Sequence, residues 1–154
     1  HCHAGEFVLI DTMQHMYRNS EDELPQAAAT APEAAFFSFG ANEMGMFSGD
    51  EELFTSRYQE FIEKFMELSP STKIYVNSIS KPSESRIGSG GYFYKWQDFN
   101  QAIEEMCGRI GAEYIDNTYI LIEHPDLYAG DGIHVSSDYY PYWLMHMASQ
   151  ARLW

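Results

Sequence analysis

The sequence is poor in positive charge. Nine Lys and Arg residues stand against 23 Asp and Glu residues, which gives a net charge of −14 over 154 residues. Proteins that bind nucleic acids or anionic membranes contact phosphate groups mainly through lysine and arginine. The charge balance therefore argues against both kinds of partner.

Long apolar runs and cysteines are also scarce. No stretch reaches the roughly 18 apolar residues of a membrane-spanning helix, so no membrane span is expected. Cys2 and Cys107 are the only cysteines, which is too few for a disulfide framework, and unpaired thiols are expected. No cluster has the spacing of metal ligands, and neither a metal nor another cofactor is expected.

The amino-terminal residues resemble no targeting signal. The chain opens with His1-Cys2-His3 and has no basic-then-apolar segment, so it is expected to be an excised or processed piece of a protein. No motif fixes the compartment, and an extracellular or cell-surface location is favoured over a cytoplasmic one.

The composition is that of one folded domain, expected over residues 1–154, with 45% hydrophobic and 16% aromatic residues. Strands are expected at 34–40, at 73–79 and at the start of 112–121, and helices at 51–68, at 96–110 and from near Asp138 to the end. Residues 80–95 are expected to form a long loop. Strands that alternate with helices predict an α/β domain with a parallel sheet, whose ligands bind at the carboxyl ends of the strands.

The helix expected at 51–68 has the clearest amphipathic pattern. Its apolar residues recur every three or four positions, which predicts one buried face. The residues expected on that face are Leu53, Phe54, Tyr58, Phe61, Phe65 and Leu68.

Residues 6–18, "EFVLIDTMQHMYR", are ambiguous. The run "FVLI" is typical of a short buried strand. The spacing of Leu9, Met13 and Met16 is instead typical of an amphipathic helix. Periodicity alone leaves both structures open for this segment.

Two short motifs can carry chemistry. Residues 40–43 read Gly-Ala-Asn-Glu after an expected strand, and residues 131–134 read Asp-Gly-Ile-His before the last helix. Together they resemble the G-x-N-D and D-x-x-H blocks of the SGNH (GDSL-type) hydrolases, with Glu43 in place of the usual aspartate. That resemblance implies a three-layer α/β/α sandwich with a flavodoxin-like parallel sheet. It also implies a hydrolase that cleaves acyl esters, such as O-acetyl groups on carbohydrates.

The resemblance implies a role for each matching residue. His134 would take the proton of a serine nucleophile, and Asp131 would hold the imidazole in the correct tautomer. Asn42 and the backbone N–H of Gly5 would donate to the oxyanion, while Glu43 would hydrogen-bond the loop. Three further residues are candidates for substrate contact: Gly40, Tyr92 and Trp96.

The nucleophile depends on how residues 6–18 align with the family. In the favoured alignment Gly5 is the glycine-block residue and 6–18 form the helix after it. The serine block and the first strands then lie before His1, and a companion segment or a second copy would complete the sheet. In the other alignment "FVLIDTM" is the first strand, and Thr12 stands where the family has its serine.

Two other classes of function compete with the hydrolase. A non-catalytic module on the same fold, lacking its nucleophile, would bind a glycan or a protein. A flavodoxin-like binder of phosphate or flavin is less favoured, because no glycine-rich phosphate loop follows an expected strand.

Overall fold

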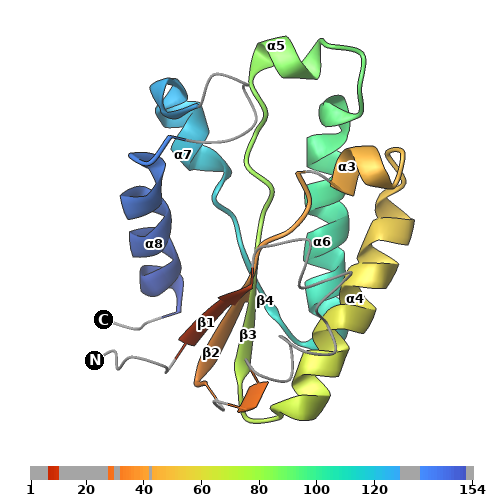
Figure 1. The fold of residues 1–154 in the computed structure, drawn as a ribbon, viewed down its shortest axis with the longest axis vertical. Helices are drawn as coiled ribbons and strands as arrows, with labels where there is room; N and C mark the ends of the chain where they lie inside the picture. The colour runs from red at the N-terminus through yellow and green to blue at the C-terminus, as the bar shows by residue number, and fades with distance from the viewer. Residues whose placement is uncertain (1–6, 11–27, 30–31, 42, 129–135, 152–154) are drawn as a thin grey trace.

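The computed structural model describes residues 7–10, 28–29, 32–41, 43–128 and 136–151 (Figure 1). Within these residues the chain forms a sheet of parallel strands in the order β1-β2-β3-β4. The strands are β1 (Phe7–Ile10), β2 (Ala34–Phe37), β3 (Lys73–Asn77) and β4 (Glu113–Ile115). Since spatial order follows chain order, each connection moves one strand across the sheet.

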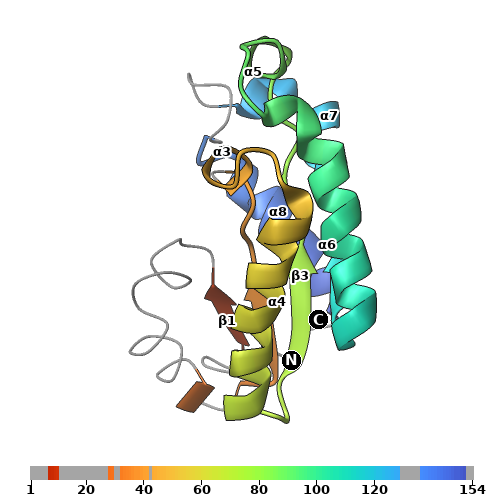
Figure 2. The same cartoon turned by 90° about the vertical axis from the view of Figure 1, so that its right-hand side faces the viewer.

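Helices cover both faces of the sheet, as the two views in Figures 1 and 2 show. The helices on one face are α4 (Glu51–Leu68) and α6 (Trp96–Ile110), and those on the other are α7 (Thr118–Glu123) and α8 (Tyr139–Gln150). Short elements lie in the connections: α3 (Glu43–Met46), α5 (Glu84–Ile87), and the 3-10 turns η1 (Phe93–Lys95) and η2 (Pro125–Leu127). Among the described residues, no helix combines the length and apolar character needed to cross a membrane.

Strand β2 shows how the sheet separates two hydrophobic cores. Ala35 and Phe37 belong to the core beneath α4 and α6, whereas Ala34 and Phe36 belong to the core beneath α7 and α8. Alternate residues of a strand point to opposite faces, so an all-apolar run fills both cores at once. The expected three-layer α/β/α sandwich with a parallel sheet is confirmed.

Helix α4 has the bounds expected from the sequence. It begins after Asp50, whose Oδ1 accepts the N–H of Leu53 at 3.0 Å and caps the first turn. Leu53 and Leu68 are 44% and 46% exposed, so their expected place on the buried face is wrong. Leu53 lies about 100° around the helix from Phe54, and Leu68 is the last residue of the helix; the buried face includes Ile62 instead.

Helix α6 also has the expected bounds. It ends at Gly111, which adopts the left-handed conformation at φ 75° that glycine tolerates best. The expectation of one long loop over 80–95 is wrong in part, since α5 and η1 lie within it. Helix α5 begins after Ser83, whose Oγ accepts the N–H of Arg86 at 3.4 Å and caps the first turn.

The expected helix over 6–18 is wrong at residues 7–10, which form strand β1. Phe7 pairs with Ala34 and Ile10 pairs with Phe37, so β1 lies directly beside β2. Four consecutive apolar residues that include β-branched Val8 and Ile10 suit a strand of a parallel sheet, and pairing with β2 outweighs the helical spacing. Residues 11–18 lie outside the described residues.

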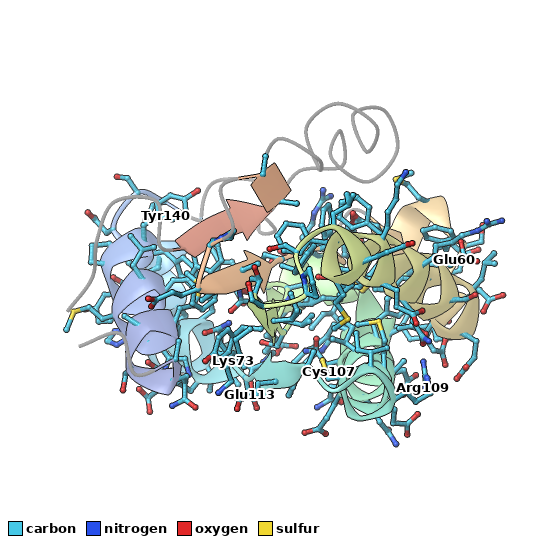
Figure 3. The ribbon with its side chains drawn as sticks, turned by 90° about the horizontal axis from the view of Figure 1, so that it is seen from below. Glu60, Lys73, Cys107, Arg109, Glu113 and Tyr140 are labelled. Carbon is cyan, nitrogen blue, oxygen red and sulfur yellow. The ribbon has the colours of Figure 1, made fainter. Side chains whose placement is uncertain are left out.

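The amino ends of β3 and β4 are joined by an ion pair. Lys73 Nζ lies 3.2 Å from Glu113 Oε1, and Figure 3 shows the two side chains side by side at this end of the sheet. Both side chains are more than half exposed, so the pair contributes about 0–1 kcal/mol at most to stability. Gly40 follows the opposite, carboxyl end of β2, whereas Gly5 comes before the amino end of β1 in the chain, so the expectation that Gly5 joins Asn42 at one oxyanion is wrong.

Candidate active site

The segments that follow the carboxyl ends of the strands contain the first motif or residues that lie close to one of the two motifs. Strand β2 is followed by Gly40 and α3, strand β3 by residues 78–82, and strand β4 by α7. Helices α3, α5 and α7 lie at this end of the molecule in Figure 1. In a parallel sheet this edge is where ligands bind.

Four of the expected site residues lie outside the described residues: Gly5, Asn42, Asp131 and His134. Their described neighbours show where the chain enters and leaves each motif. Asn42 stands between Ala41 and Glu43, and the segment with Asp131 and His134 stands between Tyr128 and Ser136. The N–H of Ser136 donates to the carbonyl of Leu127 at 2.7 Å, so the two ends of the second segment lie together.

Glu43 closes the turn around the first motif. Its side chain is 2% exposed, and its Oε2 accepts the N–H of Gly40 at 3.2 Å. The carbonyl of Gly40 accepts the N–H of Met44 at 3.0 Å. The expectation that Glu43 hydrogen-bonds this loop is confirmed, and the N–H of Gly40 is thereby engaged within the loop.

Gly40 is required at its position for steric reasons. Its φ is +138°, a value that L side chains rarely adopt. A Cβ at Gly40 would lie 2.4 Å from Cγ1 and Cδ1 of Ile79, which is well inside van der Waals contact. The first motif therefore packs directly on the segment that follows β3.

That segment is held by side chains from three other parts of the chain. The N–H of Ile79 donates to Asn100 Oδ1 at 2.7 Å, and Asn100 Nδ2 donates to the carbonyl of Ile79 at 2.9 Å. The Ser80 and Tyr139 hydroxyls are 3.1 Å apart, and the Tyr128 hydroxyl donates to the carbonyl of Lys81. Tyr128 and Tyr139 stand on either side of the segment that carries Asp131 and His134.

Buried asparagines continue this network beneath the edge. Asn117 Nδ2 donates to Asn77 Oδ1 at 2.7 Å, and Asn77 Nδ2 donates to the sulfur of Met147 at 3.2 Å. Ser78 Oγ accepts the backbone N–H of Asn117 at 2.8 Å. These contacts tie the ends of β3 and β4 to α8, and they give Ser78 a structural role.

The aromatic candidates lie at the start of α6. Tyr92 is 40% exposed and Tyr94 is 60% exposed, whereas Trp96 is partly buried against the core beneath α4 and α6. The ring of Tyr92 lies against Gly49, where a Cβ would come within 2.6 Å of it. Tyr92 and Tyr94 thus present aromatic surface to solvent.

An ion pair fixes the start of α6 to the start of α4. Lys95 Nζ donates to Glu51 Oε2 at 2.6 Å and to the carbonyl of Gly49 at 2.5 Å. The hydrogen bond from Lys95 holds the pKa of the Glu51 carboxyl below its ordinary value. This contact anchors the loop that supports Tyr92.

The described residues offer neither a metal centre nor a reactive thiol. Among them, no group of three or more His, Cys, Asp and Glu side chains could hold a metal ion. Cys107 is buried on the sheet-facing side of α6 (Figure 3), and burial raises the pKa of its thiol to about 12. A thiol with that pKa is almost entirely protonated near neutral pH and is a poor nucleophile.

Sequence reasoning missed the residues that hold the segment after β3: Asn100, Tyr128 and Tyr139. Asn100 is 21 positions from its partner Ile79, and Tyr139 is 59 positions from Ser80. The one available signal is a polar residue within an apolar stripe. Asn100 directly follows Phe99 and is buried on α6.

The fold and the two motifs define the class of protein: a three-layer α/β protein with its candidate site at the carboxyl edge of a parallel sheet. A model of the GDSL-like lipase/acylhydrolase family matches residues 12–140, which include both motifs. The chain belongs to this family, whose members are ester hydrolases, and the resemblance to SGNH (GDSL-type) hydrolases is confirmed.

Solved structures with the same fold include several esterases. A peptidoglycan O-acetylesterase superposes with a TM-score of 0.69 at 15% identity over 86% of this chain. A carbohydrate esterase family 3 protein from Talaromyces cellulolyticus gives 0.69 at 14% over 90%, and an acetyl xylan esterase gives 0.65 at 12% over 94%.

These identities establish a shared fold. The chain spans 41% of the first structure, 66% of the second and 98% of the third. None of the curated proteins matches the sequence.

Proposed function

We propose that this chain carries the base, the orienting acid and an oxyanion donor of an acyl-ester hydrolase. The family match carries the proposal, because residues 12–140 include both the Gly-Ala-Asn-Glu and the Asp-Gly-Ile-His motifs. The described neighbours of the two motifs support it. Gly40 packs on Ile79, and Tyr128 and Tyr139 contact the next two residues of the same segment.

The chemistry is acyl transfer through a covalent intermediate. His134 removes the proton of a serine hydroxyl as that hydroxyl attacks the ester carbonyl, and it later returns the proton to the leaving alcohol. Asp131 fixes the tautomer of His134 and stabilises the imidazolium. Asn42 donates its side-chain N–H to the oxyanion, and one such donor contributes about 3–4 kcal/mol to transition-state stabilisation.

One source of the nucleophile is a serine from sequence outside this chain, although the alignment that implies it also requires a helix where residues 7–10 form β1. Among the described residues, the outer edge of β1 pairs with no strand, and such an edge readily accepts another one. A companion segment or a second copy pairing there would complete the sheet. The added strand would lie about 10 Å from β2, two strand spacings away.

Strand β1 favours a second nucleophile candidate within the chain. Thr12 follows the end of β1 by two positions, and β1 lies one strand spacing from β2, about 5 Å. This is the alignment in which Ile10-Asp11-Thr12 stand where the family has Gly-Asp-Ser. A threonine hydroxyl next to His134 performs the same attack as serine.

The proposed substrate is an O-acylated carbohydrate. The structural relatives named above include proteins described as a peptidoglycan O-acetylesterase and an acetyl xylan esterase. The exposed rings of Tyr92 and Tyr94 offer flat apolar surface that can pack against a sugar, and Trp96 and Gly40 are further candidates for substrate contact. A carbohydrate of this kind fits an extracellular or cell-surface location.

A fluorophosphonate probe tests the proposal, because it labels an activated hydroxyl covalently. Peptide mapping of the labelled protein, with and without the companion segment, identifies the hydroxyl. Label on a serine of the companion segment supports the proposal, and label on Thr12 supports the second candidate. Absence of label, together with absence of ester hydrolysis, would contradict both and favour a non-catalytic glycan- or protein-binding module.

A further inference from the structure

Residues 79–81 contact described residues that come close in the chain to both motifs of the candidate site. On one side, the Ile79 side chain fills the space beside Gly40, two positions before Asn42. On the other side, Ser80 and Lys81 contact the hydroxyls of Tyr139 and Tyr128. These two tyrosines bracket the segment that carries Asp131 and His134.

The backbone of this segment is fixed by one side chain. Asn100, buried on α6, accepts from the N–H of Ile79 at 2.7 Å and donates to its carbonyl at 2.9 Å. The side-chain amide of Asn100 thus binds both the backbone N–H and the backbone carbonyl of Ile79, as a neighbouring strand would. Because Ile79 lies two residues beyond β3, the amide continues the sheet's hydrogen bonding past the end of the strand.

We infer that Asn100 is a positioning residue for the proposed catalytic groups, acting through the segment 79–81 on Gly40, Tyr128 and Tyr139, which neighbour the two motifs. The inference rests on the proposed function, because it assigns a role to the spacing of the proposed catalytic groups. Asn100 holds Ile79, which packs beside Gly40 near Asn42 in the chain. It thereby also holds the adjacent Ser80 and Lys81, whose tyrosine partners flank the segment that carries His134.

The geometry predicts what loss of the amide does. Asn100→Leu leaves the N–H and carbonyl of Ile79 without their partner, so the segment shifts toward other partners. Asn100→Asp keeps an acceptor for the N–H and, when ionised, loses the donor to the carbonyl. A displacement of the reacting groups by about 1 Å lowers the rate by up to about 100-fold.

A matched control lies at the opposite edge of the sheet. The Thr72 hydroxyl donates to the carbonyl of Pro32 at 2.7 Å and is buried, directly before β3. Thr72→Val removes the buried hydrogen bonds of this hydroxyl to Pro32 and Ser69 while leaving the shape nearly unchanged. It therefore separates a general loss of stability from a displacement at the site.

The test combines kinetics with NMR. Hydrolysis of p-nitrophenyl acetate is measured in the active form of the protein, and the Asn42 side-chain amide and His134 ring resonances are recorded in this chain. Asn100→Asp and Asn100→Leu are expected to lower kcat by about 10- to 100-fold with little change in KM, and to shift both sets of resonances. Thr72→Val is expected to change neither.

Unshifted Asn42 and His134 resonances in folded Asn100 variants would overturn the inference, as would a fall in kcat no larger than that of Thr72→Val. If both Asn100 variants fail to fold, Tyr139→Phe decides, because it removes a single hydroxyl. An unshifted His134 resonance in that variant then overturns the inference. If no form of the protein hydrolyses the ester, the proposed function fails, and the resonance shifts still test the positioning.

Discussion

The side chain of Ile79 occupies the space that any side chain at Gly40 would require. A Cβ at Gly40 would lie 2.4 Å from two carbons of Ile79, and the φ of +138° is unfavourable for other residues. The close contact joins the turn after β2 to the segment after β3. The packing of these two segments therefore depends on the absence of a side chain at this position.

Gly40→Ala is expected to lower the free energy of unfolding by about 1–3 kcal/mol, because the added methyl group overpacks Ile79 and strains the backbone. Gly45→Ala is the control, since no atom lies within 4 Å of a Cβ there. It is expected to raise stability by roughly 0.5–1 kcal/mol. Urea unfolding measures both changes, and equal stabilities for the two variants would contradict the packing described.

Glu43→Ala is expected to destabilise the protein by about 1–3 kcal/mol, because the buried N–H of Gly40 loses its acceptor. Glu43→Gln keeps an acceptor oxygen and is expected to lose less. Urea unfolding of the two variants at the same pH separates the hydrogen bond from the charge. A glutamine variant as unstable as the alanine variant would show that the hydrogen bond is not what Glu43 supplies.

Glu51 is expected to make stability depend on pH. Its folded-state pKa is lowered chiefly by the hydrogen bond from Lys95, so its contribution is fully present above the ordinary value of 4.5. That contribution is lost as the pH falls through the lowered pKa. Wild type should therefore exceed Glu51→Gln in free energy of unfolding near neutral pH, and the difference should vanish in acid.

Glu63→Gln is the control for this comparison, because its carboxylate is exposed in the middle of α4. Its difference from wild type should change far less over the same pH range. A Glu51→Gln difference that stays constant from neutral pH into acid would contradict the role assigned to the ion pair with Lys95.

Cys107 is expected to be unreactive in the folded protein. Burial raises the pKa of its thiol to about 12, and both access and thiolate formation are suppressed. In a Cys2→Ser background, Ellman's reagent near about pH 8, close to the ordinary pKa of a cysteine, should detect this thiol only after unfolding in urea. Rapid reaction of the folded protein would contradict the packing of α6 on the sheet.

The sequence predicts the helices and central strands well because each has its own local signal. The bounds of α4 and α6 follow from apolar residues at helical spacing. The strands at 34–37 and 73–77 follow from apolar runs that feed both cores. These signals need no knowledge of distant partners.

Features set by distant partners are not predictable in this way. Strand β1 exists because it pairs with β2, and its own residues fit a helix nearly as well. Asn100 has a partner 21 positions away, so its sequence position gives no indication that it holds Ile79. The exposure of Leu53 and Leu68 depends on where α6 and the sheet lie around α4.

The candidate site likewise has parts that can be recognised from the sequence and parts that depend on distant partners. The motifs at 40–43 and 131–134 are local in sequence, so they can be recognised, and the family match includes both. The segment after β3 that contacts the neighbours of both motifs carries no recognisable motif. Its role depends on three side chains that the fold brings together: Asn100, Tyr128 and Tyr139.

The central claim is that His134 acts as the general base of an ester hydrolase. The most direct test compares p-nitrophenyl acetate hydrolysis by wild type, His134→Ala and His124→Ala in the active form of the protein. His124 contacts the ring of Tyr142 and has no role in the proposed chemistry. His134→Ala should lower kcat by about 100- to 10,000-fold, the usual contribution of a general acid-base group, while His124→Ala retains the wild-type rate. Equal rates for His134→Ala and wild type would contradict the account.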